Sequence, residues 1–290
     1  MSTTNASVNT SGSSLFGTGI PAQILIALLA GLILFITLFS IESFIKTINR
    51  YSNAKTVLVP DTVTSNRAIV FRQSPSDPKA KMILPSENEL TGVEFTYSLF
   101  LYIEPSTFDG SDRLKQVFYK GYSAPFPLLG PGVFLKGDAN TMRIFMNSYK
   151  NWYSYVDVPN VPVQKWFHVG IVFRKNNLEV YVNGNLKGRV PMEDTYPYQN
   201  YQDLIVFGGT NYTNPNSLRF KPLIGDAETY KVGGSMNGRI SRFYYYRYAL
   251  SFAELNGNAN QGPSSVIQSS ADETYYLQNS LTDTWYTAGQ

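Results

Sequence analysis

Hydrophobic residues follow two different patterns along this chain. From Ile20 to Ile41 they form one nearly unbroken run, IPAQILIALLAGLILFITLFSI, of 22 residues. After Glu94 they alternate with polar residues in short stretches. A helix needs about 20 apolar residues to cross the hydrocarbon of a membrane, whereas a period of two is typical of β-strands. The sequence therefore predicts a membrane-spanning helix followed by a β domain.

The residues around the apolar run favour a retained anchor over a cleaved signal peptide. No Lys or Arg precedes it, the run is long, and Glu42-Ser-Phe-Ile-Lys46 continues the helix, whereas a signal peptide has a basic start and a shorter apolar core. Pro21 suits a first helical turn. The anchor is expected to use these side chains: Ile20, Leu25, Leu29, Leu32, Phe35, Leu38 and Ile41.

The basic residues that flank the run predict its direction. Lys46, Arg50 and Lys55 follow it and none precedes it, so the N-terminus is expected on the lumenal or outer side and the large C-terminal domain on the cytoplasmic side. Of the glycosylation sequons, Asn5 and Asn9 would then face the lumen and Asn211 would not. The basic residues are too dispersed to indicate a strong anionic-lipid patch.

The C-terminal part of the chain predicts an all-β sandwich or barrel. Short alternating segments are separated by turn residues, and Asn183-Gly184 is a type I′ turn signal. The predicted strands are 68–72, 94–103, 116–120, 132–136, 142–146, 152–158, 167–173, 178–182, 186–190, 204–207 and 239–246. Ser251 and Glu254 form a capping-box signature, which predicts one short helix.

These patterns divide the chain into five parts. They are a disordered polar N-terminus at 1–19, a transmembrane helix at 20–41, a juxtamembrane linker at 42–64, a β-sandwich at 65–257 and a polar C-terminal tail at 258–290. The tail is either partly ordered or a docking peptide that uses its apolar side chains: Tyr275, Tyr276, Leu277, Trp285 and Tyr286.

Composition narrows the functional classes. The chain has 21 Tyr and 18 Phe, which favour strands. Its net charge of +3 is too small to indicate nucleic acid as a partner. It has no cysteine, which excludes a disulfide framework, a thiol nucleophile and cysteine-ligated metal sites.

Three segments resemble the laminin-G-like, or concanavalin A-like, jelly-roll family. They are EFTYSLFLYI at 94–103, the hairpin with KWFHV at 165–169 and LEVYVNG at 178–184, and GRISRFYYYRYALSFAE at 238–254. The resemblance covers about residues 65–257 and implies a two-sheet jelly-roll sandwich. It does not imply one function, because this fold carries lectins, glycosidases and adhesion modules.

A narrower resemblance lies in two further segments. PGVFL at 131–135 and VPNVPVQKWFH at 158–168 are similar to laminin-G-like proteins encoded by large DNA viruses with an internal membrane. This resemblance implies a minor capsid protein or another membrane component of the virion.

The residues give no support for catalysis. Glycosidases of this fold need two carboxylates at E-x-D-x-x-E spacing, and that spacing does not occur here. His168 is the only histidine in the chain, and neither a catalytic triad nor a zinc site completes around it. We therefore expect a protein that is not an enzyme and in which His168 is structural.

No cofactor is predicted, with calcium as the weaker alternative. Asp109-Gly-Ser-Asp112 and Gly137-Asp-Ala-Asn140 are oxygen-rich, but turn residues explain them better. Exposed aromatics could instead form a surface for a sugar or a protein partner. The candidates for that surface are Trp152, Tyr153, Tyr155, Tyr196, Tyr198 and Tyr201.

Two functional hypotheses remain. The first is a structural tether in which the helix holds the chain in a membrane and the sandwich binds other proteins, such as those of a capsid shell. The second is a membrane-tethered lectin. The positive-inside bias favours the first, because a lectin needs its sandwich on the glycan-bearing side.

Overall fold

The computed structural model describes residues 20–78, 80–86, 93–122, 128–149, 154–192, 197–209, 211–214 and 230–268. The chain forms two compact units, Met1–Asn53 and Ala54–Gln290. The predicted N-terminal sequons at Asn5 and Asn9 and the aromatic residues of the tail lie outside the described residues.

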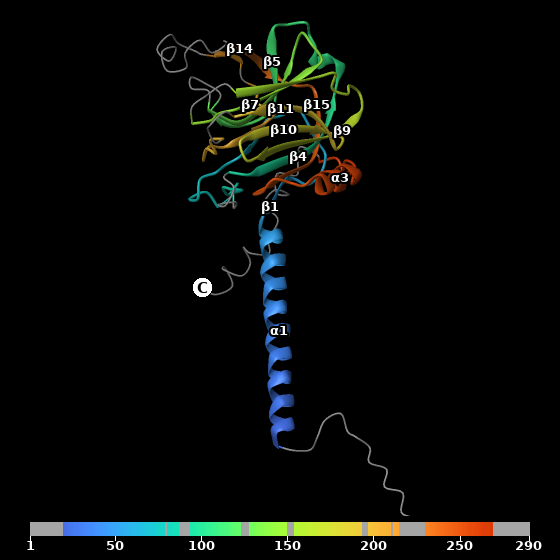
Figure 1. Ribbon diagram of the computed structural model, residues 1–290. Coiled ribbons are helices and arrows are strands. Elements are labelled where there is room, and N and C mark those ends of the chain that lie inside the picture. Colours follow the sequence, from blue (N-terminus) through green and yellow to red (C-terminus); the bar gives the residue numbers. More distant parts are fainter. Residues whose placement is uncertain are drawn as a thin grey trace, which may run out of the picture. The chain divides into compact units, whose positions relative to one another are not determined.

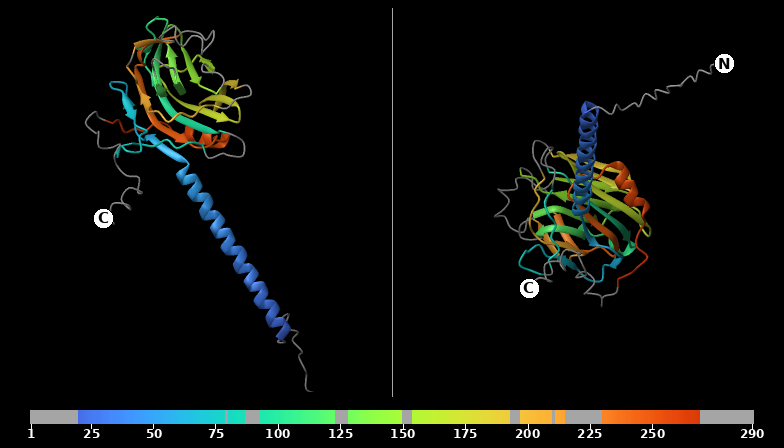
Figure 2. Two further views of the ribbon diagram at one scale, coloured as in Figure 1. Left: turned by 90° about the vertical axis from the view of Figure 1, so that its left-hand side faces the viewer. Right: turned by 90° about the horizontal axis from the view of Figure 1, so that it is seen from below.

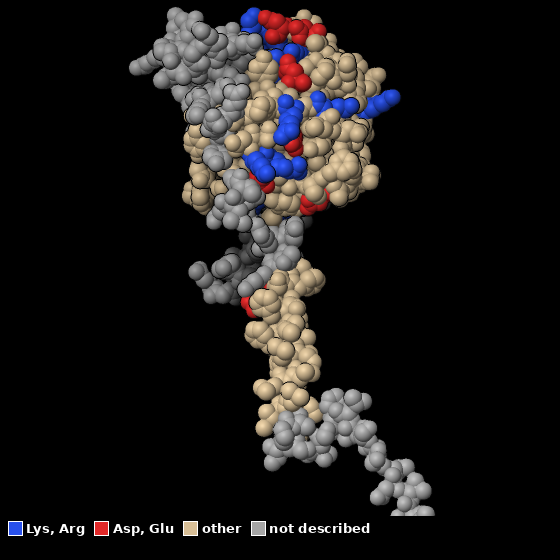
Figure 3. Space-filling model, in the orientation of Figure 1, with Lys and Arg blue, Asp and Glu red and all other residues tan. Residues whose placement is uncertain are grey.

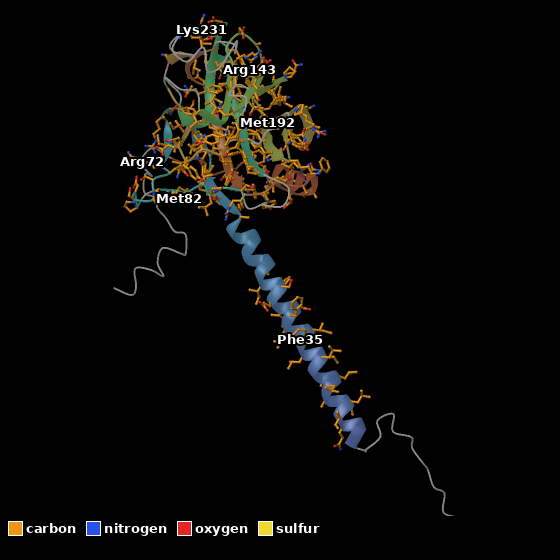
Figure 4. The ribbon with its side chains drawn as sticks, turned by 60° about the vertical axis from the view of Figure 1, so that its left-hand side comes forward. Phe35, Arg72, Met82, Arg143, Met192 and Lys231 are labelled. Atoms are coloured by element: carbon orange, nitrogen blue, oxygen red, sulfur yellow. The ribbon has the colours of Figure 1, made fainter. Side chains whose placement is uncertain are left out.

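The first unit contains one long helix, α1 (Ile20–Asn53; Figure 1). Its apolar span Gln23–Ile45 has a mean hydropathy of 2.9 and none of it is buried. Phe35 projects outward from the helix (Figure 4) and stacks on Phe39 with ring centroids 6.4 Å apart. The described surface of the helix is almost entirely uncharged (Figure 3). The helix extends past Ile41 because Glu42–Asn53 contains no Pro or Gly to end it.

The second unit is a sandwich of two sheets, which confirms the predicted jelly-roll class (Figure 2). The first sheet runs in the order β1-β15-β4-β9-β10-β11, with β2 beside β15. Its strands are β1 (Lys55–Val59), β2 (Val63–Thr64), β4 (Phe95–Ile103), β9 (Trp166–Arg174), β10 (Asn177–Val182), β11 (Asn185–Pro191) and β15 (Gly238–Tyr246). All of its described pairings are antiparallel.

The second sheet runs in the order β13-β14-β5-β6-β7-β8, with β12 beside β5 and β3 beside β12. Its strands are β3 (Ile69–Phe71), β5 (Arg113–Tyr122), β6 (Leu128–Lys136), β7 (Thr141–Met146), β8 (Ser154–Pro159), β12 (Leu204–Val206), β13 (Asn211–Asn214) and β14 (Tyr230–Ser235). Of its described pairs only β14 with β5 is parallel.

Alternation along β4 places large side chains between the two sheets. Tyr97 of β4 lies 5.7 Å from Phe118 of β5 and 6.0 Å from Phe243 of β15, measured between ring centroids. Phe118 and Phe243 lie 4.6 Å apart. Aromatic side chains of this size each remove a large apolar area from water. The described members of this core all come from Leu58 onward, so the sandwich holds its core without α1.

The other face of β4 is also covered. The helix α3 (Phe252–Asn260) packs over the first sheet, where Leu255 joins a small apolar cluster with Val172 and Tyr246. Ser251 and Glu254 form the predicted capping box at the start of α3. β4 therefore has a core face and an α3 face, as the apolar residues on both sides of the segment 94–103 predict.

In the structure the sandwich begins before residue 65 and extends beyond residue 257, the two boundaries that the sequence predicts. The predicted linker at 42–64 is helix as far as Asn53 and then contributes β1 and β2. After α3 the chain remains attached through Ile267, which forms a parallel bridge with Thr62. The sequence pattern does not predict β1, because KTVLV is short and follows the helix directly. The position of β1 is set by its pairing with β15.

The turn Asn183-Gly184 provides a test of the hairpin. Its φ angles are 48° and 76°, and a Cβ added at Gly184 would lie 1.9 Å from Oδ1 of Asn256. We expect Gly184→Ala to lower the free energy of unfolding by at least about 1–2 kcal/mol, because a side chain is strained at positive φ. Urea unfolding of the protein in detergent, followed by tryptophan fluorescence, measures this loss.

Gly257→Ala is the matched control for that substitution. Gly257 lies on the exposed side of α3 and a Cβ there meets nothing within 4 Å. Alanine also favours a helix over glycine by up to about 1 kcal/mol. Equal losses of stability in the two variants would contradict the assignment of strain to the turn.

Candidate functional site

An aromatic rim lies beside the end of β7. Tyr149 and Tyr198 contact each other edge to face, with ring centroids 5.2 Å apart. The contact is fixed by the backbone, since Ser148 pairs with Pro197 and the Tyr198 N–H donates to the Asn147 carbonyl at 2.8 Å. Tyr149 and Tyr201 are 69% and 72% exposed. We call the Tyr149–Tyr198 pair, with the exposed Tyr201 three residues further along the chain, the tyrosine rim.

Side-chain amides hold the segment that carries the rim. Asn200 donates from Nδ2 to the Lys120 carbonyl at 3.0 Å. Gln199 donates from Nε2 to the Tyr245 hydroxyl at 3.1 Å, and its Oε1 accepts from the Ser86 N–H at 2.9 Å. These amides are therefore committed to protein contacts, so a ligand of the rim would meet the rings and the backbone first.

A buried lysine supports the same segment from below. Nζ of Lys120 donates to the carbonyls of Asn200 and Gln202, each at 2.7 Å. Burial lowers the pKa of Lys120 to about 8. This role of Lys120 has no signal in the sequence, because the neighbours of its strand are fixed only by the fold. Lys120 positions the segment that carries the rim.

The hollow beside the rim is small. Its lining includes Tyr97, Lys120, Gly130 and Tyr201, and its volume is about 10 Å³. That is space for about one water molecule. A sugar or peptide would therefore lie across the exposed rings and would not enter the fold.

The structure brings together only part of the predicted surface. Tyr198 and Tyr201 belong to the rim, and Tyr149, which the sequence analysis did not select, joins them. Trp152, Tyr153 and Tyr196 lie outside the described residues. Tyr149 could not be selected from sequence, because its position depends on the Ser148–Pro197 pairing.

Tyr155 belongs to a different group, on β8. The Arg143 guanidinium lies 4.1 Å from the centre of its ring and binds Asp157 through two hydrogen bonds of 2.7 Å. Lys136 lies 3.0 Å from the same carboxylate. Burial opposes ionisation of Asp157, but these hydrogen bonds outweigh it and hold its pKa below the ordinary value. Figure 4 shows Arg143 on the part of the sandwich nearer Lys231 than Met82.

Several carboxylates in the described part of the chain have basic or hydroxyl partners. Glu179 contacts Arg174, Arg189 and the Tyr181 hydroxyl. In the first calcium candidate, Asp109 pairs with Lys115 and Asp112 with Lys231. These partners leave the carboxylates as ion pairs within the fold. Glu193 and Asp194 lie outside the described residues.

His168 belongs to a buried polar network under α3. Its Nε2 and the Ser98 hydroxyl share a hydrogen bond of 2.8 Å, and Nδ2 of Asn258 donates to the same hydroxyl at 3.2 Å. Nδ1 of His168 is buried without a partner. A serine nucleophile needs an acid on that nitrogen and access to a substrate, whereas Ser98 and His168 are both buried. The network joins β4, β9 and α3 and is structural.

The burial of His168 predicts a pH dependence of stability. Burial lowers the pKa of His168 from 6.5 to about 4. The unfolded chain therefore binds a proton, below its pKa of about 6.5, that the folded chain excludes. The stabilisation is present above pH 6.5 and is lost as the pH falls towards 4, by up to roughly 1.4 kcal/mol per pH unit. Urea unfolding at a series of pH values measures the loss.

The control for the pH series is His168→Gln, which keeps a polar side chain and cannot titrate. Its stability should depend less steeply on pH than that of the parent between 6.5 and 4, whatever its absolute value. Carboxylates titrate in both proteins and cancel in the comparison. An identical slope would show that His168 does not contribute.

One known protein family matches most of this chain. The profile of the Concanavalin A-like lectin/glucanases superfamily matches residues 76–256. The chain belongs to this superfamily. The superfamily name covers both binding proteins and enzymes, so membership alone does not define an activity. No curated protein matches the chain.

Solved structures give a fold-level likeness only. The binding domain of botulinum neurotoxin serotype D is 12% identical with a TM-score of 0.45, and the match covers 71% of this chain and 41% of that one. The binding domain of Paraclostridial Mosquitocidal Protein 1 is 13% identical with a TM-score of 0.44, covering 71% and 46%. This chain thus spans less than half the length of those proteins, and similarity at this level identifies no ligand.

Proposed function

We propose that this protein is a single-pass membrane-anchored binding module without catalytic activity, which tethers a partner to the bilayer. The observation that carries the proposal is the full exposure of the apolar span Gln23–Ile45 in a chain that also contains a folded sandwich. A core helix of a soluble protein would be mostly buried, and a signal peptide would have a basic start.

Two hydroxyl side chains within the span are compatible with insertion into lipid. The Thr37 hydroxyl donates to the Leu34 carbonyl at 2.8 Å, and the Ser40 hydroxyl donates to the Ile36 carbonyl at 2.7 Å. Each polar group in the hydrocarbon must find a partner within the protein. Both hydroxyls satisfy this requirement inside α1 itself.

The finer proposal is a structural tether whose sandwich lies on the cytoplasmic side. The basic residues that follow the span support this direction. A minor capsid protein that links an internal viral membrane to its shell is the most specific form of the proposal. Its support is the resemblance of residues 131–135 and 158–168 to such viral proteins.

Protease protection on sealed microsomes tests the topology. The full chain should resist alkaline extraction, the sandwich should be digested from outside, and Asn211 should stay unglycosylated. A protected sandwich with a glycan on Asn211, which is exposed in the fold, would contradict the cytoplasmic direction and with it the tether. Extraction by alkali would contradict the anchor itself.

A membrane-tethered lectin is the second candidate, and the tyrosine rim favours it. Exposed aromatic rings provide stacking faces, and this superfamily includes lectins by name. Tyr149 and Tyr201 would then supply most of the contact with a sugar.

A glycan array separates the two candidates. For the lectin, we expect the parent protein to bind a defined set of glycans and Tyr149→Ala/Tyr201→Ala to lose more than about 1 kcal/mol of binding free energy, as typical for removal of interface aromatics. Phe252→Ala removes an equally exposed aromatic from α3 and serves as the control. The lectin hypothesis would be contradicted if the parent protein bound no glycan on the array, or if the control variant lost as much binding free energy as the tyrosine variant.

A further inference from the structure

The fold assembles a pair of cations that the sequence keeps far apart. Lys55 opens β1, and Arg242 lies on β15, the neighbouring strand. Nζ of Lys55 stands 3.7 Å from the centre of the Tyr244 ring, and Arg242 lies two residues before Tyr244 on the strand that pairs with β1. The pairing of β1 with β15 therefore brings a lysine and an arginine near each other.

Neither cation has an acidic partner among the residues that the structure describes. The ion pairs found there involve other residues. Asp61 is the carboxylate that acts on Tyr244, and it accepts a hydrogen bond from Ser264 at 2.9 Å. Burial and the charge of Arg242 both lower the pKa of Lys55. Two like charges held together in this way gain stability from an anion that binds between them.

The surroundings of the pair extend the basic surface. The Arg247 N–H donates to the Ala54 carbonyl at 2.9 Å, and its Nε donates to the Pro85 carbonyl at 2.8 Å. We call Lys55, Arg242 and Tyr244 the basic edge. Cations beside a tyrosine form a combination that protein surfaces present to lipid headgroups.

Chain connectivity limits how far Lys55 can lie from the anchor. Residues 46–53 continue α1 beyond the apolar span, and Lys55 follows two residues after its end. Eight helical steps of about 1.5 Å and two further residues of up to about 3.6 Å put Lys55 at most roughly 20 Å along the chain from Ile45. The charged surface of a membrane acts over a Debye length of about 8–10 Å beyond its headgroups.

We propose that the basic edge is a binding site for anionic phospholipid headgroups, with Lys55 and Arg242 as the residues that contact the phosphate. The site rests on the proposed membrane anchoring and deepens it: the sandwich has a second attachment to the same bilayer. The cytoplasmic leaflet carries the anionic lipids, so the site agrees with the direction that the basic flank of α1 favours.

Vesicle sedimentation of the sandwich, residues 54–290, tests the site apart from the helix. The parent should bind vesicles of phosphatidylcholine with phosphatidylserine and not vesicles of phosphatidylcholine alone. Lys55→Gln/Arg242→Gln should weaken binding by about 30-fold, since each basic residue at an anionic surface contributes a factor of about five. Thermal unfolding checks that the double variant is folded. If the double variant is not folded, Lys55→Gln alone tests the site, with an expected loss of vesicle binding of about fivefold.

Lys165→Gln/Lys187→Gln is the matched control. Both lysines are exposed; Lys187 lies on β11, at the opposite edge of the same sheet from β1. The control removes the same net charge and should bind within about threefold of the parent, because only charges near the headgroups contribute. Equal weakening in both variants would overturn the site in favour of non-specific attraction. If the sandwich binds inorganic phosphate at millimolar concentration but does not bind anionic vesicles, the proposal that the ligand is a lipid is wrong.

The outcomes separate the two proposals. If the full chain resists alkaline extraction while the sandwich ignores anionic vesicles, the anchor stands and the basic edge fails. If the sandwich binds anionic vesicles through Lys55 and Arg242 while the full chain is extracted by alkali, the basic edge stands and the anchor fails.

Discussion

The sandwich depends on aromatic contact between its two sheets. Tyr97 of β4 touches Phe118 from the second sheet and both Phe243 and Tyr245 from its neighbour β15. If these rings were smaller, the sheets would close up or leave a cavity, at a cost of several kcal/mol for each aromatic lost. The registers of β4, β15 and β5 are fixed together by this cluster. Everything attached to those strands, including the polar network under α3 and the basic edge, inherits its position from them.

Much of this fold is predictable because the same alternation of apolar and polar residues recurs along the sequence. The alternation in 94–103 and 167–173 assigns each residue to a face, and Asn183-Gly184 fixes the connection between β10 and β11. The capping box at Ser251 and Glu254 predicts the start of α3 in the same local way. Such signals depend only on residues that are close in the sequence, so they can be recognised before the fold is known.

The surfaces are less predictable because they arise from contacts between distant segments. The basic residues after the apolar span are dispersed in the sequence, which argues against a lipid patch, yet the pairing of β15 with β1 brings Arg242 near Lys55. Tyr149 looks like any other tyrosine until Ser148 pairs with Pro197. His168 is the opposite case: its structural role follows from the lack of triad partners, although only the fold reveals Ser98 and Asn258 beside it.

The geometry of the sandwich constrains how its surfaces can act together. Tyr201 of the tyrosine rim lines a hollow with Pro85, whose carbonyl accepts a hydrogen bond from Arg247. The Arg247 N–H donates to the Ala54 carbonyl, next to Lys55. A short series of contacts therefore connects the tyrosine rim with the basic edge. The opposite end, where β5 begins beside β14 (Figure 1), presents Lys115–Asp109 and Lys231–Asp112. These ion pairs share no residue with the basic edge, so the lipid contact proposed there leaves them unchanged.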